Sequence, residues 1–233
     1  MSENKTGKYL KYAIGEILLV VIGILIALQV NNWNENRKLK AQQQVFIKSI
    51  KQDLEADVAY LNDYIKKIDS SYQNLKNQSE HVNRVSYSKD SLISFLKHDI
   101  NIFVISFNGY NNNTYESMKA SGQLDLLDDE TKEQLYNLSI FQSSSLEEYQ
   151  ALRNDYFDEI EKLVAAYPIP ISFSFIKNTP QNKFLWDDID EKDLMLKLNS
   201  WGTVKANLYR NISRENKSIL EKTKAVLKLL DNE

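Results

Sequence analysis

One uninterrupted apolar run near the N-terminus constrains this chain more than any other feature of its sequence. Residues 13–30 read AIGEILLVVIGILIALQV, and only Glu16 and Gln29 among these eighteen residues are polar. A helix needs about 20 apolar residues to cross the ~30 Å hydrocarbon core of a bilayer. Because the run is apolar on every side of a helix, we predict that residues 13–32 form a transmembrane anchor.

The flanking residues fit an anchor that is retained. Tyr9 and Tyr12 precede the run and Trp33 follows it, and aromatic rings of this kind favour the headgroup regions of a bilayer. A cleaved signal peptide is the alternative, but its apolar region spans only about 7–15 residues and ends at a small-residue site. The sequence that follows here is NNWNENRK. We therefore expect a retained anchor with Tyr9, Tyr12 and Trp33 as its interface residues.

The charges beside the span do not orient it. The positive-inside rule compares the Lys and Arg residues on the two sides of a membrane helix. Here the two sides carry equal numbers, namely Lys5, Lys8 and Lys11 before the run and Arg37, Lys38 and Lys40 after it. Charge alone therefore favours neither orientation.

One face of the predicted span carries small residues. Glu16, Val20, Gly23 and Ala27 recur every three or four positions and so share one side of a helix. Gly23 and Ala27 form a small-xxx-small pair that lets another backbone approach closely. This face favours self-association, although small residues are common in membrane helices in general. Glu16 lies one turn inside the span, where its carboxylate can reach the interface, be protonated or face a partner helix.

Beyond the anchor, the sequence is typical of long helices. All three Pro lie between residues 168 and 180, and Gly is scarce, so most of the chain lacks strong helix breakers. Apolar residues recur every three or four positions over 47–75, and every three, four, seven or eight positions over 135–163 and 194–230, the spacing of an apolar helix stripe. The first stripe could continue the anchor in one unbroken helix to about residue 82. Because three long stripes most economically bury one another, we predict a mainly α fold in which residues 33–233 form an antiparallel bundle.

Shorter elements are predicted between the stripes. Residues 89–98 and 114–121 read as short helices, and Gly122 suits a left-handed C-cap for the second. The runs NIFVISF (101–107) and IPISFSF (169–175) could pair as a small two-stranded ribbon, since the latter alternates apolar residues with Pro or Ser. Acidic residues that favour helix N-termini precede or begin the second and third long helices, namely Asp128, Asp129, Glu130, Asp187, Asp188, Asp190 and Glu191.

The composition excludes several classes of function. Lys and Arg number 29 and Asp and Glu 32, so there is no basic field to hold nucleic acid. The chain has no cysteine, which excludes disulfides, thiolate metal sites and cysteine nucleophiles. Its scattered glycines form neither GxGxxG nor GxxxxGK, the loops that cradle nucleotide phosphates. We predict no nucleic-acid partner and no cofactor.

The remaining candidates for chemistry do not form a recognised pattern. His81 and His98 are the two histidines, and neither lies in an HExxH motif. The acidic run at 187–193 has the wrong spacing for a calcium-binding EF-hand and favours a charge cluster at a helix N-terminus. The serine run at 143–145 lacks a GxSxG context and is typical of a solvated helix face. We predict no catalytic residue, no metal site and no enzymatic activity.

The most loop-like segment is NGYNNNT (108–114). Its Asn and Gly residues suit left-handed turns, and Tyr110 is a candidate for an exposed aromatic residue. Loops held at the end of a rigid bundle can bind ligands, but most loops merely connect two elements. Both interpretations remain open at this point.

Two segments together resemble a known family. KYLKYAIGEILLVVIGILIALQVNNWNENRK (8–38), followed by TYESMKASGQLDLL (114–127), is similar to an uncharacterised family of single-pass membrane proteins from Bacteroidota, a domain of unknown function. The anchor with its trailing NNWNE is the specific part of the resemblance. It implies a bacterial inner-membrane protein with residues 1–12 in the cytoplasm and the domain 33–233 in the periplasm. It supplies no catalytic residue.

Three functions are weighed on these features. The first is a non-enzymatic, membrane-anchored module that binds an envelope protein, or a second copy of itself, through the membrane helix and the adjoining stalk. The second is a ligand-binding or sensory accessory domain that acts through a separate signalling partner, since helical bundles often hold small molecules between their helices. An enzyme ranks last because no catalytic arrangement stands out.

Overall fold

A computed structural model describes residues 5–84, 88–169 and 180–231, and within them all regular structure is helical. This confirms the predicted mainly α fold. The elements are α1 (Lys5–Arg84), α2 (Lys89–His98), α3 (Asn113–Ser121), the 3₁₀ helix η1 (Gln123–Leu126), α4 (Asp129–Ala166), α5 (Pro180–Asp187) and α6 (Glu191–Leu230).

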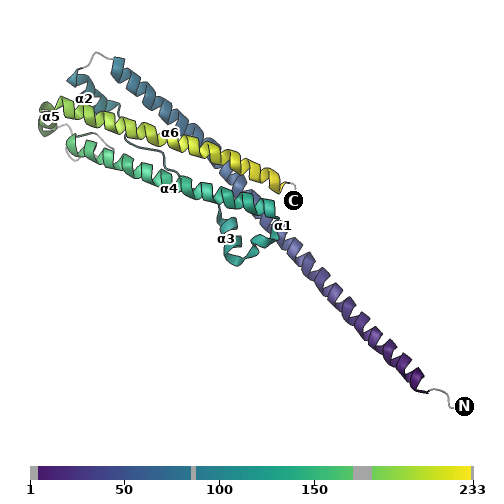
Figure 1. Cartoon of the computed structure of the whole chain (residues 1–233). Helices are drawn as coiled ribbons and strands as arrows, with labels where there is room; N and C mark the ends of the chain where they lie inside the picture. The colour runs from purple at the N-terminus through teal and green to yellow at the C-terminus, as the bar shows by residue number, and fades with distance from the viewer. Residues whose placement is uncertain (1–4, 85–87, 170–179, 232–233) are drawn as a thin grey trace.

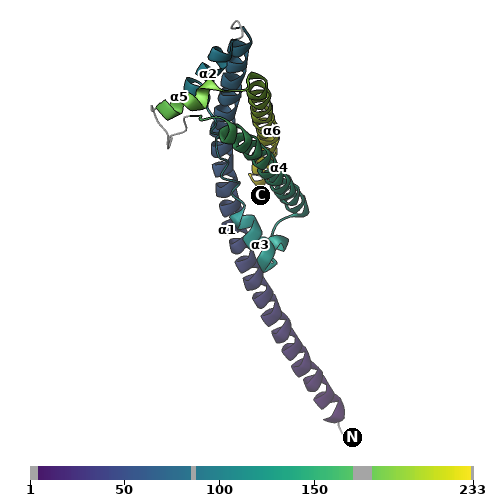
Figure 2. The same ribbon diagram turned by 90° about the vertical axis from the view of Figure 1, so that its left-hand side faces the viewer.

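Helix α1 is a single helix of 80 residues, and it joins two different parts of the molecule. Its N-terminal half stands alone, whereas its C-terminal half packs against α4 and α6 (Figures 1 and 2). The predicted continuity to about residue 82 is therefore confirmed. We call residues 9–45 the N-terminal arm, and we call the end of the bundle that carries α2 and α5 the distal end.

The bundle has three long helices with mixed directions (Figure 1). Helix α6 is antiparallel to both others, because Asp231 at its end pairs with Lys51 while Ser200 near its start donates to Glu159 late in α4. Helices α1 and α4 run in the same direction, so the predicted antiparallel arrangement is correct for α6 and wrong for this pair. The reason is that residues 99–112 return along the bundle as an extended segment, so that α4 starts again from the arm side.

The predicted apolar stripes form the core of this bundle. A distal cluster surrounds Tyr156 and Leu194, and a proximal cluster surrounds Leu61 and Ile219. Most of the largest fully buried side chains come from the three stripes, namely Ile50, Leu61, Ile68, Tyr156, Leu163, Leu194, Leu208, Ile219, Val226 and Leu230. Leu96 of α2 and Met118 of α3 complete the set.

The helix ends follow the predicted capping residues. Gly122 ends α3 in the left-handed conformation, with φ of 70°. Asp128 and Asp190 are the N-caps of α4 and α6, where their carboxylates accept hydrogen bonds from amides of the first turn. Helix α2 has the predicted bounds, and its N-cap is Ser88. The acidic residue Asp190 thus has the helix-capping role expected of the run at 187–193.

The small two-stranded ribbon is not formed within the described residues. Residues 101–107 are extended but carry no strand pairing, because their backbone groups bond to side chains of the helices instead. The other half of the predicted ribbon, beyond Ile169, lies outside the described residues.

Candidate functional site

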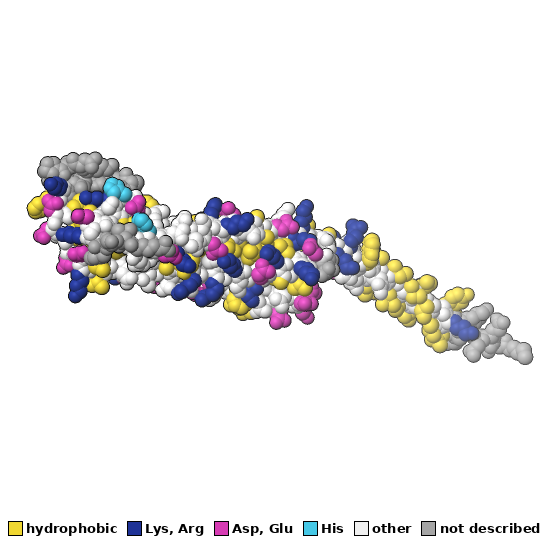
Figure 3. Space-filling model, turned by 90° about the horizontal axis from the view of Figure 1, so that it is seen from above, with side chains coloured by type: hydrophobic (Ala, Val, Ile, Leu, Met, Phe, Trp, Pro, Cys, Tyr) yellow, Lys and Arg dark blue, Asp and Glu magenta, His cyan; other side chains and the backbone are white. Residues whose placement is uncertain are grey.

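The residues predicted at a membrane interface all lie on the arm, away from the bundle. Tyr9, Tyr12 and Trp33 are 75%, 76% and 64% exposed, and the Arg37 guanidinium lies 5.5 Å from the centre of the Trp33 ring. Hydrophobic side chains cover the arm between its charged ends (Figure 3). Among the described residues, this helix alone is long and apolar enough to cross a membrane, judged by length and composition.

The predicted packing face is open along the arm. Glu16, Val20 and Ala27 are exposed, and a Cβ added to Gly23 would meet no atom within 4 Å. Because successive residues of an α-helix are turned by about 100°, this face points about 180° away from the side of α1 that carries Leu54. The face with small residues and the face that holds the bundle are therefore on opposite sides of one helix.

Sequence reasoning did not find the second notable site, which we call the polar seam. It is the line along which the extended segment 99–112 lies between α1, α4 and α6. An extended chain packed along a bundle leaves its backbone groups without helix or sheet partners. Tyrosine hydroxyls of the surrounding helices bond to these groups. Tyr156 donates to Ile102 O, and Tyr64 donates to Ile105 O at 3.5 Å. In the opposite direction, Phe107 N donates to Tyr149 Oη at 3.1 Å, and Asn108 N donates to Tyr60 Oη at 2.9 Å.

Asp57 is the acidic centre of the seam and is fully buried. Its Oδ1 accepts hydrogen bonds from the Asn111 backbone N (2.8 Å) and Nδ2 (2.7 Å), and its Oδ2 accepts from Gln142 Nε2 at 3.2 Å. Burial raises the pKa of this carboxyl, and the nearby Asp53 charge adds to the rise, while the three hydrogen bonds oppose it. The carboxylate thus acts as an acceptor for amides from two other elements.

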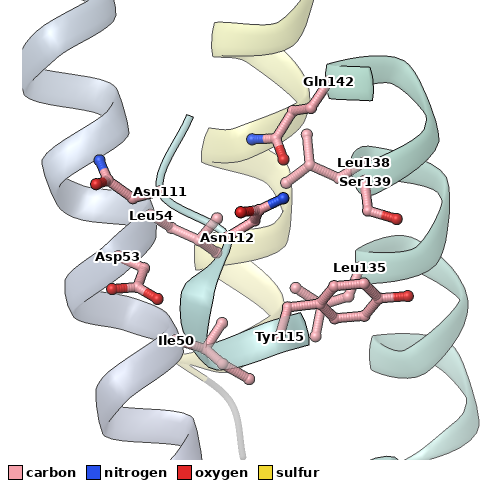
Figure 4. A pocket seen from close by; sticks show the side chains of 10 residues that line it. All are labelled: Ile50, Asp53, Leu54, Asn111, Asn112, Tyr115, Leu135, Leu138, Ser139 and Gln142. Atoms are coloured by element: carbon pink, nitrogen blue, oxygen red, sulfur yellow. The ribbon is translucent and has the colours of Figure 1, made fainter. Parts of the chain in front are cut away.

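A small cavity lies beside this cluster (Figure 4). Its lining includes Asp53, Asn111, Asn112, Ser139 and Gln142. The volume is about 20 Å³, room for one water molecule, which needs about 10–15 Å³. Asp53 itself accepts a hydrogen bond from the Thr114 backbone N at 3.0 Å, at the start of α3. The cavity therefore fits a bridging water and is too small for an organic ligand.

Tyr110 is part of this packed seam, so the expectation of an exposed tyrosine was wrong. Its hydroxyl donates to Asn216 Oδ1 at 3.0 Å and lies 3.2 Å from the Ser145 hydroxyl. Its ring packs edge-on against the Phe107 ring, with the two ring centres 4.9 Å apart. Burial raises the pKa of its hydroxyl. The expectation that the serine run at 143–145 is a solvated helix face is wrong for Ser145, which is buried. Ser143 and Ser144 are exposed as expected. The segment 108–114 connects two elements and is held against the bundle by the half-buried Tyr110 and Asn111.

Lys205 closes the distal part of the seam. Its side chain is buried, and its Nζ donates to the Asn101 carbonyl. The rings of Trp201, Tyr209 and Tyr156 surround the ammonium group at 5.2, 5.8 and 5.9 Å. Burial lowers the pKa of Lys205 to about 8. Lys205 and Asp57 are charged residues at positions where the helical spacing of a stripe predicts an apolar residue. This departure from the pattern was the sequence signal that could have revealed both.

The histidines do not join a catalytic arrangement with other predicted candidates. His81 and His98 are both exposed, and His81 shares a shallow surface groove with Asp90 and Asp99. In the part of the chain that the structure describes, no three His, Asp or Glu side chains are grouped to hold a metal ion. The absence of enzymatic activity stays a prediction.

The extended segment 99–112 and most of α1 fall within a region shared with other proteins. Residues 16–126 match a family of unknown function (DUF6090). The match covers slightly less than half of the chain, from the arm through α2, the extended segment and α3 to the end of η1. It confirms the resemblance to an uncharacterised family over these residues. No curated protein and no solved structure matches the chain.

Proposed function

We propose that this chain is a single-pass membrane-anchored module that binds a second protein, in the first place another copy of itself, through its N-terminal arm. The continuity of α1 carries the proposal: one rigid helix bears an apolar, unpartnered arm and the core face of a folded bundle. Hydrocarbon is the solvent in which such an exposed apolar helix is stable.

We place the anchor in a bacterial inner membrane, with residues 1–12 in the cytoplasm, 13–32 across the bilayer and 33–233 in the periplasm. The support for this orientation is the resemblance of the two motifs to a family of single-pass Bacteroidota membrane proteins. The exposure of Tyr9, Tyr12 and Trp33 at the two ends of the span fits aromatic anchoring in both headgroup regions.

The geometry of α1 favours pairing of two arms. Glu16, Val20, Gly23 and Ala27 point about 180° away from the bundle face of the same helix. Two copies can therefore bring these faces together while their bundles point outward and do not collide. Gly23 and Ala27 would let the two helix backbones approach closely, which is how small residues promote helix association in membranes.

The orientation can be tested with adjacent serines of α4, because the chain has no cysteine. In intact spheroplasts, a membrane-impermeant maleimide should label the Ser144→Cys chain, whose side chain is exposed, and should label Ser145→Cys poorly because that position is buried. Both should react after denaturation. Labelling of Ser144→Cys only after lysis would place the bundle in the cytoplasm and reject the proposed orientation.

Self-association can be tested with one cysteine on each side of the arm. Oxidation in native membranes should link Gly23→Cys chains into a disulfide dimer, whereas Leu25→Cys, on the bundle side of the helix, should stay monomeric. Equal yields at both positions would mean random encounter, and no dimer at either would reject this face. A larger mixed adduct at Gly23→Cys would redirect the search to an envelope protein.

A second candidate function is a ligand-binding or sensory accessory domain that acts through a separate signalling partner. The observation that favours it is a groove of about 510 Å³ between α1, α2 and α6 at the distal end. This volume lies within the range of about 300–1,000 Å³ found for small-molecule sites.

A further inference from the structure

The distal groove has an apolar floor and a polar edge. Its floor includes Leu75 from α1, Phe95 from α2 and Trp201 from α6, all of them largely buried. Amide and hydroxyl groups lie along its edge, among them those of Gln78 and Asn199. Helices α1, α2 and α6, from distant parts of the sequence, thus line one amphipathic surface hollow.

Gly202 lines this groove from the first third of α6. Glycine weakens a helix interior, so its presence there calls for a packing reason. The neighbouring protein atoms do not supply one, because a Cβ added to Gly202 would meet no atom within 4 Å. The missing side chain instead leaves space open to the groove.

Charge indicates what the groove would accept. Lys76 is the charged residue of its lining, and no Asp or Glu lies there. Lys76 forms no ion pair within the described ranges. A ligand with an apolar body on the floor and one negative charge near Lys76 would satisfy both features, since the exposed ammonium group of Lys76 attracts an anion.

We propose that the distal groove binds an amphipathic monoanion, a molecule with a hydrocarbon or aromatic body and one acidic group such as a carboxylate. The body lies over Phe95 and Trp201, and the acidic group lies beside Lys76. This inference rests on the second candidate function and specifies its ligand class. It is independent of self-association through the arm.

The probe is 11-bromoundecanoate, used below its micelle concentration with the full-length chain in lipid nanodiscs. Trp33→Phe and Trp186→Phe leave Trp201 as the one tryptophan of the three, so bromine quenching reports contact with the groove floor. Lys76 lies about 65 Å along α1 from residue 32, at 1.5 Å per residue, so probe dissolved in the bilayer cannot quench Trp201. We expect saturable quenching.

Two substitutions at Gly202 form a matched pair. Gly202→Ala adds one carbon to the groove and should weaken binding only slightly, whereas Gly202→Leu fills the groove and should weaken binding about tenfold or more, beyond 1.4 kcal/mol by the conversion for a tenfold change. Lys76→Gln should weaken binding roughly threefold, as expected for a partly exposed ion pair. Circular dichroism of each variant shows whether the bundle has folded.

The outcomes separate the ligand class from the function itself. If the neutral analogue 11-bromoundecanol quenches Trp201 as well as the carboxylate does, and Gly202→Leu abolishes both, the groove binds ligands but the anionic class is wrong. If neither probe gives saturable quenching, or if quenching persists in Gly202→Leu, the groove is not a ligand site and the second candidate function loses its support.

Discussion

At the scale of single residues, buried polar side chains decide how the seam is closed. Asp57 accepts three hydrogen bonds from Asn111 and Gln142. Asp57→Ala leaves these donors buried without an acceptor, so we expect it to lower the free energy of unfolding by about 1–3 kcal/mol. Asp57→Asn keeps one acceptor oxygen and should cost less. Urea unfolding measures both; an alanine variant as stable as the wild type would contradict the proposed role of this carboxylate.

Lys205 gives a prediction about pH. Its folded pKa of about 8 lies below the ordinary 10.5, so the fold disfavours the charged amine. The loss of unfolding free energy caused by burying the charged amine is therefore fully present below pH 8. It disappears as pH rises from 8 to 10.5. Relative to Lys205→Met, the wild type should gain up to about 3 kcal/mol of unfolding free energy over this range. Thermal unfolding at several pH values tests it, with the exposed Lys224→Met as control; a constant difference between wild type and Lys205→Met would contradict it.

At the scale of elements, local patterns predicted the helices and long-range bonding determined the rest. Apolar spacing and capping residues were sufficient for α1, α2 and the N-terminus of α4, because helix hydrogen bonds and caps lie within a few residues of one another. The seam was not predictable in this way. The Tyr149 hydroxyl accepts a hydrogen bond from the Phe107 amide, 42 residues away in the sequence. No local pattern marks such a pair.

The seam as an element should loosen when one of its hydroxyl groups is removed. Tyr149→Phe leaves the Phe107 amide without its acceptor, so we expect a loss of about 1–3 kcal/mol and faster hydrogen exchange at that amide. Tyr136→Phe is the matched control, because Tyr136 is 53% exposed on the same helix. Hydrogen exchange with site-specific readout is the measurement, and unchanged protection of Phe107 would show that this bond does not hold the segment.

At the scale of the whole molecule, α1 fixes the rotation of the bundle relative to the arm. The arm face with Gly23 and the core face lie on opposite sides of one continuous helix. If two arms pair through that face, the direction in which the bundles point depends on the number of residues between the two faces. Association should therefore respond to helical phase and not simply to length.

Insertions after Lys40 separate these two variables. Two added alanines turn the bundle by about 200° towards the pairing face, whereas seven added alanines lengthen the helix more but restore the phase to within about 20°. In a Gly23→Cys background, we expect disulfide dimers to be lost with two alanines and retained with seven. Equal dimer yields in both insertion variants would mean that the bundles do not limit pairing, and loss in both would mean that the length of the stalk matters and its phase does not.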